Sequence, residues 1–216
     1  KKAKEIAQEY KKKLIGVNHM EGHLLSSLAL NSKGKGQMPY RDLKYPVLAL
    51  LISGGHTQLI LMSKSGKYQL LGETLDDAVG EAYDKTARML GLGYPGGEVL
   101  TEFAKSGVTS EYKFPVPMAK DPSLNFSFSG LKTAVYYLIK NMTKDGWVLT
   151  KKHVANIAAS FELSAITQLQ IKLNKAIIQT QPKTILVGGG VSSSAKVRAG
   201  LRKIAKKNYV QIFFPR

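Results

Sequence analysis

The chain has 216 residues, 44% of them hydrophobic, which is enough for a buried core in one large domain or two small ones. The absence of cysteine excludes disulfides and thiolate metal sites and fits a cytoplasmic protein, and since no apolar run is long enough to span a bilayer, we expect no membrane partner. With 32 basic and 15 acidic residues, the chain has a net charge of +17, which favours a polyanion such as nucleic acid as its partner.

The first part of the chain is expected to form a helix and a strand. Residues 1–13 have apolar positions at helical spacing, and residues 14–17 have the apolar character of a short buried strand. Because a domain rarely opens on a helix that leads into such a strand, we expect other strands to precede it. Residues 31–46 combine Gly, Pro and Lys without periodicity, which predicts a flexible connection between a first region, 1–45, and a second, 46–216.

The first region contains two histidines, His19 and His23, four residues apart. On a helix this spacing puts both imidazoles on one face, as two nitrogen ligands of a divalent metal require. Zinc proteases place a glutamate directly after the first histidine, whereas Glu21 lies two positions on, about 200° around the helix axis, which argues against a protease. The alternative is a helix that carries two histidines without binding metal.

The second region opens on two strands around a glycine turn. Residues 46–52 are a continuous apolar run, residues 53–57 read Ser-Gly-Gly-His-Thr, and residues 58–62 are again apolar, with a third strand expected over 67–71. Glycines in such a turn allow phosphate oxygens to approach the backbone N–H groups. The turn therefore suits a nucleotide, although an ordinary glycine hairpin with a solvated His56 is the alternative.

Residues 76–90 have helical periodicity, with Asp76 as the expected N-cap and glycines 91 and 93 as the stop. Three carboxylates fall at i, i+4 and i+7 and are expected to share one face, where they can accept hydrogen bonds from ribose hydroxyls: Asp77, Glu81 and Asp84. The alternative is a solvated face balanced by Lys85 and Arg88. Tyr-Pro-Gly-Gly at 94–97 predicts a tight turn.

The segment 125–132 alternates aromatic and hydroxyl residues before a helical run, with Ser129 as a candidate N-cap and Lys132 as a candidate phosphate contact, or else a packed loop before a capped helix. A long helix is expected over 154–180, a buried strand over 183–187, a helix over 194–207 and a strand over 210–214. Between them, Gly188 to Ser194 follow a strand and open a helix, an arrangement that attracts anions. Tight strand-to-helix packing is the alternative explanation of these glycines.

Six segments taken in order, V-N-H-M-E-G-H, L-I-S-G-G-H-T-Q, D-D-A-V-G-E-A-Y-D-K, G-Y-P-G-G, F-S-F-S-G-L-K-T-A-V and V-G-G-G-V-S-S-S, resemble the bacterial TsaD family and its archaeal and eukaryotic counterparts. The resemblance implies an α/β, actin-like, two-lobed fold of the sugar kinase and heat-shock ATPase type, here without the first strands of lobe one and the end of lobe two. It also implies transfer of a threonylcarbamoyl group from threonylcarbamoyl-adenylate to the exocyclic amine of the adenosine beside the anticodon of ANN-decoding tRNAs. TsaB-like and TsaE-like subunits are the implied partner proteins.

The resemblance assigns roles to individual residues. His19 and His23 match the family's histidine ligands to one iron or zinc ion. The matches to substrate-binding positions are Leu51, Ile52, Ser53, Gly54, Gly55, Asp84, Gly97 and Ser194. Ser194 stands where the family has an asparagine, so it cannot present an amide to the substrate.

Two further departures concern the ends. The family begins with a phosphate-binding E-T-S-C-D strand, and its third metal ligand is an aspartate that follows a strand similar to residues 211–216; the sequence holds neither. Two alternatives to the transferase therefore stay open. One is an inactive or partner-dependent binding fragment of this family, and the other is a metalloprotease, which the position of Glu21 disfavours.

Overall fold

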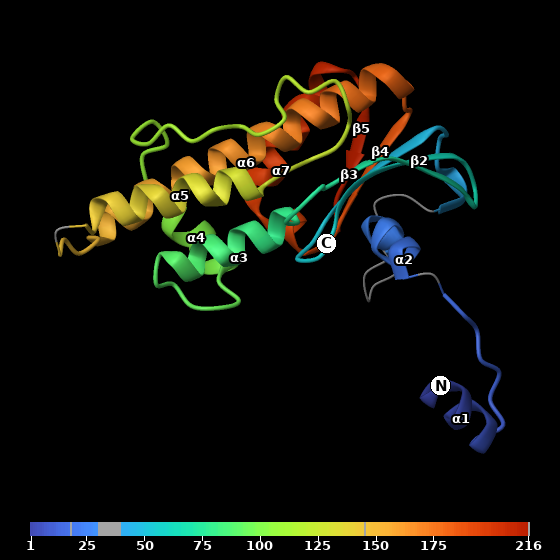
Figure 1. Cartoon of the computed structure of the whole chain (residues 1–216). Helices are drawn as coiled ribbons and strands as arrows, with labels where there is room; N and C mark the ends of the chain where they lie inside the picture. The colour runs from blue at the N-terminus through green and yellow to red at the C-terminus, as the bar shows by residue number, and fades with distance from the viewer. Residues whose placement is uncertain (18, 30–39, 145, 216) are drawn as a thin grey trace.

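The computed structural model describes residues 1–17, 19–29, 40–144 and 146–215. Its core is a five-stranded mixed sheet in the order β3-β2-β1-β4-β5 (Figure 1). β1 (Val47–Ile52), β2 (Thr57–Lys64) and β3 (Lys67–Glu73) form an antiparallel meander, and β4 (Thr184–Gly188) and β5 (Gln211–Phe213) continue the sheet in parallel from β1. Every residue of β1 is buried, because this central strand is covered on both faces.

One face of the sheet carries the larger core. Leu48, Leu50 and Ile52 of β1 point to this side and pack with five helices, which lie together on it in Figure 1. The helices are α3 (Val79–Met89), α4 (Gly97–Ala104), α5 (Ser129–Met142), α6 (Lys151–Thr180) and α7 (Ala195–Lys207). Within the described residues, none of the helices is long and apolar enough to cross a membrane.

The opposite face is covered by α2 (His19–Leu25) and the short 3-10 helix η1 (Ser26–Leu28). Leu24 and Leu28 pack there against Val47 and Ala49, the residues of β1 whose side chains alternate with those of the larger core. This packing holds the histidine helix at the carboxyl end of the parallel strands. Two further 3-10 helices are η2 (Tyr40–Asp42) and η3 (Gly190–Ser193), and α1 (Lys2–Glu9) lies apart from the sheet (Figure 1).

The strands expected over 46–52, 58–62, 67–71, 183–187 and 210–214 and the helices over 154–180 and 194–207 are confirmed. The buried strand expected over 14–17 is wrong, since Ile15 and Val17 are 70% and 76% exposed. An apolar run becomes a strand only where a neighbouring strand accepts its backbone hydrogen bonds, and no described strand lies beside it. Residues 31–39 of the expected connection lie outside the described residues, and the division at 45/46 stays a prediction.

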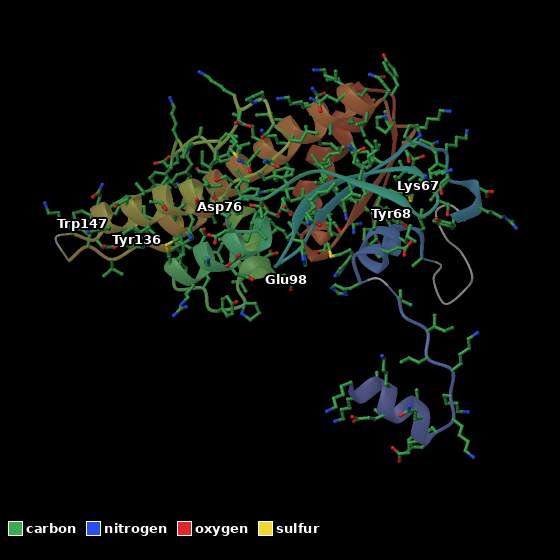
Figure 2. All side chains as sticks on the ribbon, turned by 45° about the vertical axis from the view of Figure 1, so that its right-hand side comes forward. Lys67, Tyr68, Asp76, Glu98, Tyr136 and Trp147 are labelled. Carbon is green, nitrogen blue, oxygen red and sulfur yellow. The ribbon has the colours of Figure 1, made fainter. Side chains whose placement is uncertain are left out.

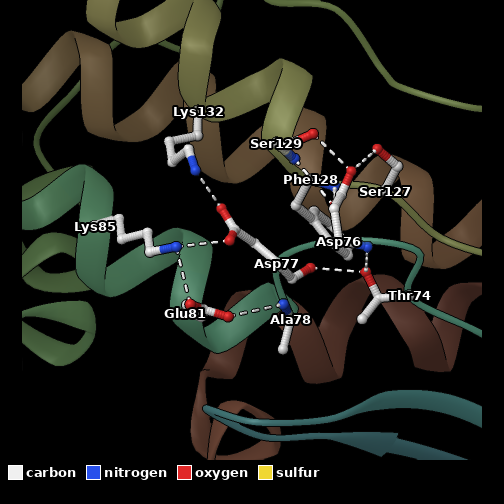
Figure 3. Close-up of polar contacts among 10 residues, drawn as sticks. All are labelled: Thr74, Asp76, Asp77, Ala78, Glu81, Lys85, Ser127, Phe128, Ser129 and Lys132. Carbon is white, nitrogen blue, oxygen red and sulfur yellow. Dashed lines mark hydrogen bonds and ion pairs between the residues drawn. The ribbon is translucent and has the colours of Figure 1, made fainter.

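Two expected N-caps are also wrong. α3 begins at Val79 after Ala78, so Asp76 does not cap it, and α5 has Phe128 as its N-cap, so Ser129 is its first residue. Asp76 instead accepts hydrogen bonds from the N–H groups of Phe128 and Ser129 at 2.8 and 3.2 Å (Figure 3). A carboxylate from a distant segment therefore satisfies the first amides of α5, a pairing that local spacing cannot reveal.

Candidate functional site

The two histidines of α2 point toward each other. The Nε2 atoms of His19 and His23 are 3.1 Å apart, and the rings meet edge to face with centroids 4.4 Å apart. Two nitrogens bound to one metal at 2.0–2.1 Å with a tetrahedral angle lie about 3.3 Å apart, so this pair fits two ligands of one ion. The described residues contain no group of three His, Asp or Glu side chains that could hold a metal, so the pair is an incomplete ligand set.

A glycine at the end of β4 lets α2 approach the sheet. A Cβ on Gly188 would lie 2.3 Å from the carbonyl oxygen of His23, a distance that no side chain could tolerate. The same carbonyl accepts a hydrogen bond of 2.6 Å from Ser26, which fixes the end of the helix. Gly188 therefore positions His23, which is the packing explanation of this glycine.

The glycine turn after β4 and the histidine helix share one pocket of about 260 Å³. Its walls come from three parts of the chain, and its lining residues are His23, Ser26, Gly189, Gly190, Ser192, Ser193, Arg198 and Pro215. The structure thus brings together two motifs that the sequence analysis treated separately. His23 comes from the predicted metal pair, and Gly189, Gly190, Ser192 and Ser193 belong to the predicted anion-binding turn.

The hairpin turn lies against the glycine turn. Gly189 has φ +91, and a Cβ there would lie 2.3 Å from the carbonyl oxygen of Ile52. On the other side, Gly80 in the first turn of α3 donates to the carbonyl of Ser53 at 3.2 Å, and a Cβ on Gly80 would lie 2.6 Å from that oxygen. The hairpin is therefore clamped between the glycine turn and α3, and this close approach requires glycine on both sides.

Within the hairpin, the hydroxyl oxygen of Ser53 accepts hydrogen bonds from the N–H groups of Gly55 and His56 at 3.3 and 3.0 Å. Gly54 and Gly55 are exposed. The side chains of Leu51 and Ile52 are buried, at 1% and 0% exposure. Any contact of these two residues with a ligand therefore has to use their backbone atoms.

The three carboxylates expected on one helical face do not form one. Asp77 precedes α3, and it holds both Lys85 and Lys132 at 2.6 and 2.5 Å (Figure 3). Burial raises the pKa of Asp77, but the two ammonium groups outweigh it and leave the pKa below its ordinary value. Glu81 also pairs with Lys85, at 2.9 Å. Asp77, Glu81 and Lys132, the candidate phosphate contact, are thus joined through Lys85 in one network of ion pairs.

Asp84 points elsewhere and meets another predicted site residue. Its Oδ1 accepts hydrogen bonds from the N–H groups of Gly96 and Gly97 at 2.9 and 2.8 Å. A Cβ on Gly97 would lie 3.2 Å from that oxygen, so a larger residue would crowd the contact. Among the described residues no hydrogen bond to Oδ2 of Asp84 is seen.

Ser194 is the N-cap of α7, and its hydroxyl oxygen accepts from the N–H group of Val197 at 3.4 Å. The glycine turn does not open this helix directly, because η3 lies between them. Ser192 and Ser193 of η3, rather than Ser194, line the pocket. The N-terminus of α7, which was predicted to lie directly beside the glycines, is therefore separated from Gly189 by η3.

Sequence reasoning missed Arg198. Its guanidinium donates to the carbonyls of Ser192 and Pro215 at 2.5 and 2.7 Å and lies over the ring of Phe214, 5.4 Å from its centroid. It thus ties the wall made by η3 to the segment after β5. The sequence places Arg198 near the start of a helix that follows a glycine turn, which could have indicated an anion-binding arginine. Its distance along the chain from Pro215 does not predict their contact.

Glu21 lies away from the histidine pair, as its sequence position predicted. Its carboxylate accepts a hydrogen bond from Tyr68, and both residues line a second pocket of about 120 Å³ with Met20, Leu24 and Ile60. Burial raises the pKa of Tyr68, and Glu21 raises it further. Figure 2 shows Tyr68 on the sheet beside α2. A carboxylate held in this way is not placed to serve as the base of a zinc protease.

Comparison with known proteins shows the family to which the chain belongs. A family profile described as "TsaD: tRNA N6-adenosine threonylcarbamoyltransferase" matches residues 1–216. Proteins named tRNA N6-adenosine threonylcarbamoyltransferase are similar to the chain at 44% identity in Bordetella pertussis (93% of this chain, 56% of the relative), 45% in Vesicomyosocius okutanii (99% and 58%) and 41% in Fervidobacterium nodosum (95% and 58%). The chain thus spans a little over half the length of these curated relatives.

Two solved structures share its fold. They are full-length HypF in the phosphate- and nucleotide-bound form (TM-score 0.65, 11% identity, 97% of this chain and 41% of that one) and HypF from T. kodakarensis (0.58, 14%, 99% and 35%). The expected α/β fold of the actin-like class is thereby confirmed. The profile match over residues 1–216 and the relatives at 44% and 45% identity lead to one conclusion: the chain belongs to the TsaD family of tRNA N6-adenosine threonylcarbamoyltransferases.

Proposed function

We propose that this chain acts as an acyltransferase on tRNA. The group that it transfers is threonylcarbamoyl, the donor is threonylcarbamoyl-adenylate, and the acceptor is the exocyclic amine of the adenosine beside the anticodon of ANN-decoding tRNAs. The observation that carries the proposal is the pocket shared by His23 and the glycine turn, in a chain of this family. The relatives carry the same activity in their names, and the net charge of +17 suits a tRNA substrate.

The pocket residues suggest how the substrate is held. The adenylate carries a phosphate, and the exposed backbone at Gly190 lies at the space next to His23. The hydroxyls of Ser192 and Ser193 donate to the carbonyls of Gly189 and Gly190 at 2.6 and 2.8 Å and thereby hold the shape of the turn. Backbone N–H groups of a glycine turn are suitable partners for phosphate oxygens. Gly54 and Gly55 of the adjoining hairpin and Oδ2 of Asp84 are the further contacts that we assign to the adenylate.

His19 and His23 would hold one divalent metal, iron or zinc, as two of its ligands. When bound, such an ion supplies Lewis-acid polarisation of a carbonyl oxygen. In the reaction itself the amine nitrogen forms a bond with the carbamoyl carbon, the bond from that carbon to the adenylate oxygen breaks, AMP leaves and the amine loses one proton. The residues of the pocket contribute by holding the adenylate in line with the amine, which replaces an encounter of two solutes with a positioned pair.

The proposal includes partners and a compartment. tRNA is the substrate, TsaB-like and TsaE-like subunits are the partner proteins, and the reaction takes place in the cytoplasm, the compartment of the tRNA pool. The division into a first region, 1–45, that carries the metal pair and a second, 46–216, that carries the nucleotide loops belongs to the same proposal. Leu24 and Leu28 of the first region pack against β1 of the second, which supports a contact between the two regions beside the site.

The test is transfer in a defined mixture. The chain is incubated with threonylcarbamoyl-adenylate, unmodified ANN-decoding tRNA and the partner subunits, and the nucleosides are quantified by mass spectrometry together with released AMP. We expect threonylcarbamoyladenosine and AMP to form in equal amounts. Binding of adenylate and tRNA without any product would instead support the alternative of a partner-dependent binding fragment.

A further inference from the structure

An exposed aromatic surface lies at the free end of the two-helix unit formed by α5 and α6. Figure 1 shows this end on the far side of the molecule from α2, and Figure 2 labels Tyr136 and Trp147 there. Trp147 is 71% exposed and Val148 is 82% exposed, and Tyr136 and Tyr137 are about half exposed. Large aromatic side chains gathered on an exposed surface indicate a binding site, because single exposed rings are common but clusters are not.

The charges around these rings have one sign. Residues 136–152 contain four lysines, Lys140, Lys144, Lys151 and Lys152, and a single acidic residue, Asp145. All four lysines are exposed. Within the described part of the chain none of them forms an ion pair, whereas the paired lysines, such as Lys85 and Lys132, lie near the sheet end of α3 and α5. The four lysines therefore outnumber the acidic residue of this segment by three.

Rings and charges also alternate in space. Tyr136 and Lys140 are one helical turn apart on α5, and Lys144 follows shortly after the helix ends at Met142. The rings of Tyr136 and Tyr137 meet edge to face with centroids 5.4 Å apart. Aromatic faces interleaved with cations are the arrangement that binds unpaired bases by stacking and their phosphates by charge.

We propose that this surface, the α5–α6 tip, is a second contact for tRNA, in which unpaired bases stack on Trp147 and the two tyrosines and the four lysines neutralise phosphates. The identity of the RNA rests on the proposed function. α6 has 30 residues and is therefore about 45 Å long, and the tip lies at its N-terminal end, on the far side of the molecule from α2 (Figure 1). A partner that contacts both the tip and the histidine site is therefore required to be an extended molecule. A folded tRNA, with its anticodon at the pocket and other unpaired bases at the tip, meets this requirement, whereas a nucleotide or a short oligonucleotide does not.

Trp147 is the single tryptophan of the chain and makes the test direct. Unmodified ANN-decoding tRNA is titrated into the 216-residue chain while tryptophan emission is recorded, with and without acrylamide, and complex formation is followed independently by the anisotropy of labelled tRNA. We expect saturable quenching that follows the anisotropy, and reduced access of acrylamide to the indole. Complex formation that leaves the emission and the acrylamide access unchanged would overturn the proposal.

Two sets of variants separate a local surface from a diffuse positive field. Trp147→Ala should weaken tRNA binding by about 5- to 150-fold, the range for the loss of one base stack. The triple change of Lys144, Lys151 and Lys152 to Ala should weaken it at least about tenfold more than the matched triple change of Lys203, Lys206 and Lys207, which are exposed on α7. It should also reduce the slope of log affinity against log salt by roughly two to three. Equal losses from the two triples would overturn the proposal, and circular dichroism confirms that each variant is folded.

Transfer and binding are read separately, so that a failure of the proposed function is distinguishable. Quenching of Trp147 by tRNA in the absence of any threonylcarbamoyl product would support the tRNA contact at the tip and contradict the proposed transferase activity. Normal product formation with an unchanged KM for tRNA in the tip variants would contradict the tRNA contact at the tip and support the proposed transferase activity. Vesicles of phosphatidylserine and phosphatidylcholine are the last probe, and quenching by vesicles as strong as that by tRNA would overturn the assignment to RNA.

Discussion

The Nε2 atoms of His19 and His23 lie 3.1 Å apart across one turn of α2, a separation that suits one shared ion. Leu24, the neighbour of His23, is buried in the smaller core, and the His23 carbonyl lies against Gly188. The pair is therefore held on a helix that the sheet positions.

Replacement of either histidine should remove metal binding. His19→Ala or His23→Ala should lower the affinity for Zn²⁺ or Fe²⁺ by at least about 100-fold, since even partners of metal ligands contribute 10- to 100-fold. Metal content by mass spectrometry and anaerobic titration measure the effect. His153→Ala, a change on α6 outside the site, serves as the matched control. Equal metal content in wild type and in the double variant of His19 and His23 would contradict the assignment.

The close approach of Gly189 to the hairpin should make this position intolerant of any side chain. Gly189→Ala places a Cβ 2.3 Å from the Ile52 carbonyl oxygen and forces a non-glycine residue to φ +91. Overpacking and backbone strain together should lower the free energy of unfolding by about 2 to 6 kcal/mol, measured by urea denaturation. Gly190→Ala is the control, because no atom lies within 4 Å of its added Cβ. Similar losses in the two variants would show that the clamp is not the cause.

The capping of α5 by Asp76 should make stability depend on acid pH. Burial raises the pKa of Asp76, but hydrogen bonds from Ser127, Ser129 and the Phe128 amide outweigh it and hold the pKa below its ordinary value of 3.8. A carboxylate with a lowered folded pKa stabilises the protein above its unfolded pKa, and the contribution is lost as the pH falls through the folded pKa.

Asp76→Ala should therefore cost about 1 kcal/mol of unfolding free energy at pH 7, the usual value of a lost helix cap, and less at pH 2, which lies below the ordinary pKa of 3.8. Urea denaturation at both pH values measures the difference. Asp42→Asn is the control, since the Asp42 side chain is 55% exposed and lies 3.8 Å from Arg41. A loss that is the same at both pH values would mean that the charge of Asp76 does not matter.

The ion pair between Glu162 and Lys196 should show the opposite pH dependence. The Glu162 side chain is 1% exposed, and the Lys196 ammonium lies 3.0 Å from its carboxylate. Burial raises the pKa of Glu162, which Lys196 only partly offsets, so the pKa stays above its ordinary value of 4.5. A folded pKa above the unfolded one means that the native state binds more protons, so stability falls as the pH rises from the unfolded to the folded pKa.

Lys196→Met should steepen this fall, because it leaves a buried carboxylate without its cation. We expect a loss of about 1 to 3 kcal/mol at pH 7, less than for a fully buried pair because Lys196 is itself 39% exposed. The double variant Glu162→Gln with Lys196→Met should recover part of the loss in thermal or urea unfolding. A double variant that is no more stable than Lys196→Met would show that the unpaired charge is not the cause.

Periodicity and turn chemistry were sufficient to predict most elements, because local interactions decide them. The apolar run at 46–52, the glycine turn and the long α6 all have unambiguous patterns. Where a local pattern had two outcomes, the tertiary partner decided. Residues 14–17 are apolar but have no described strand to pair with, and Asp76 has a suitable spacing for α3 but meets the amides of α5.

The features of the candidate site likewise fall into those that the sequence determined and those that the tertiary structure decided. The sequence alone determined that His19 and His23 lie on one helical face and that two glycine turns follow strands, since both facts depend on spacing within a few residues. Only the tertiary structure decided that His23, the turn at 189–190 and Arg198 share one pocket, and that Asp84 meets Gly97 while Asp77 meets two lysines. The reason is that contacts between distant segments depend on how closely their backbones approach each other. A glycine allows a close approach, but its position in the sequence does not say which segment will approach it.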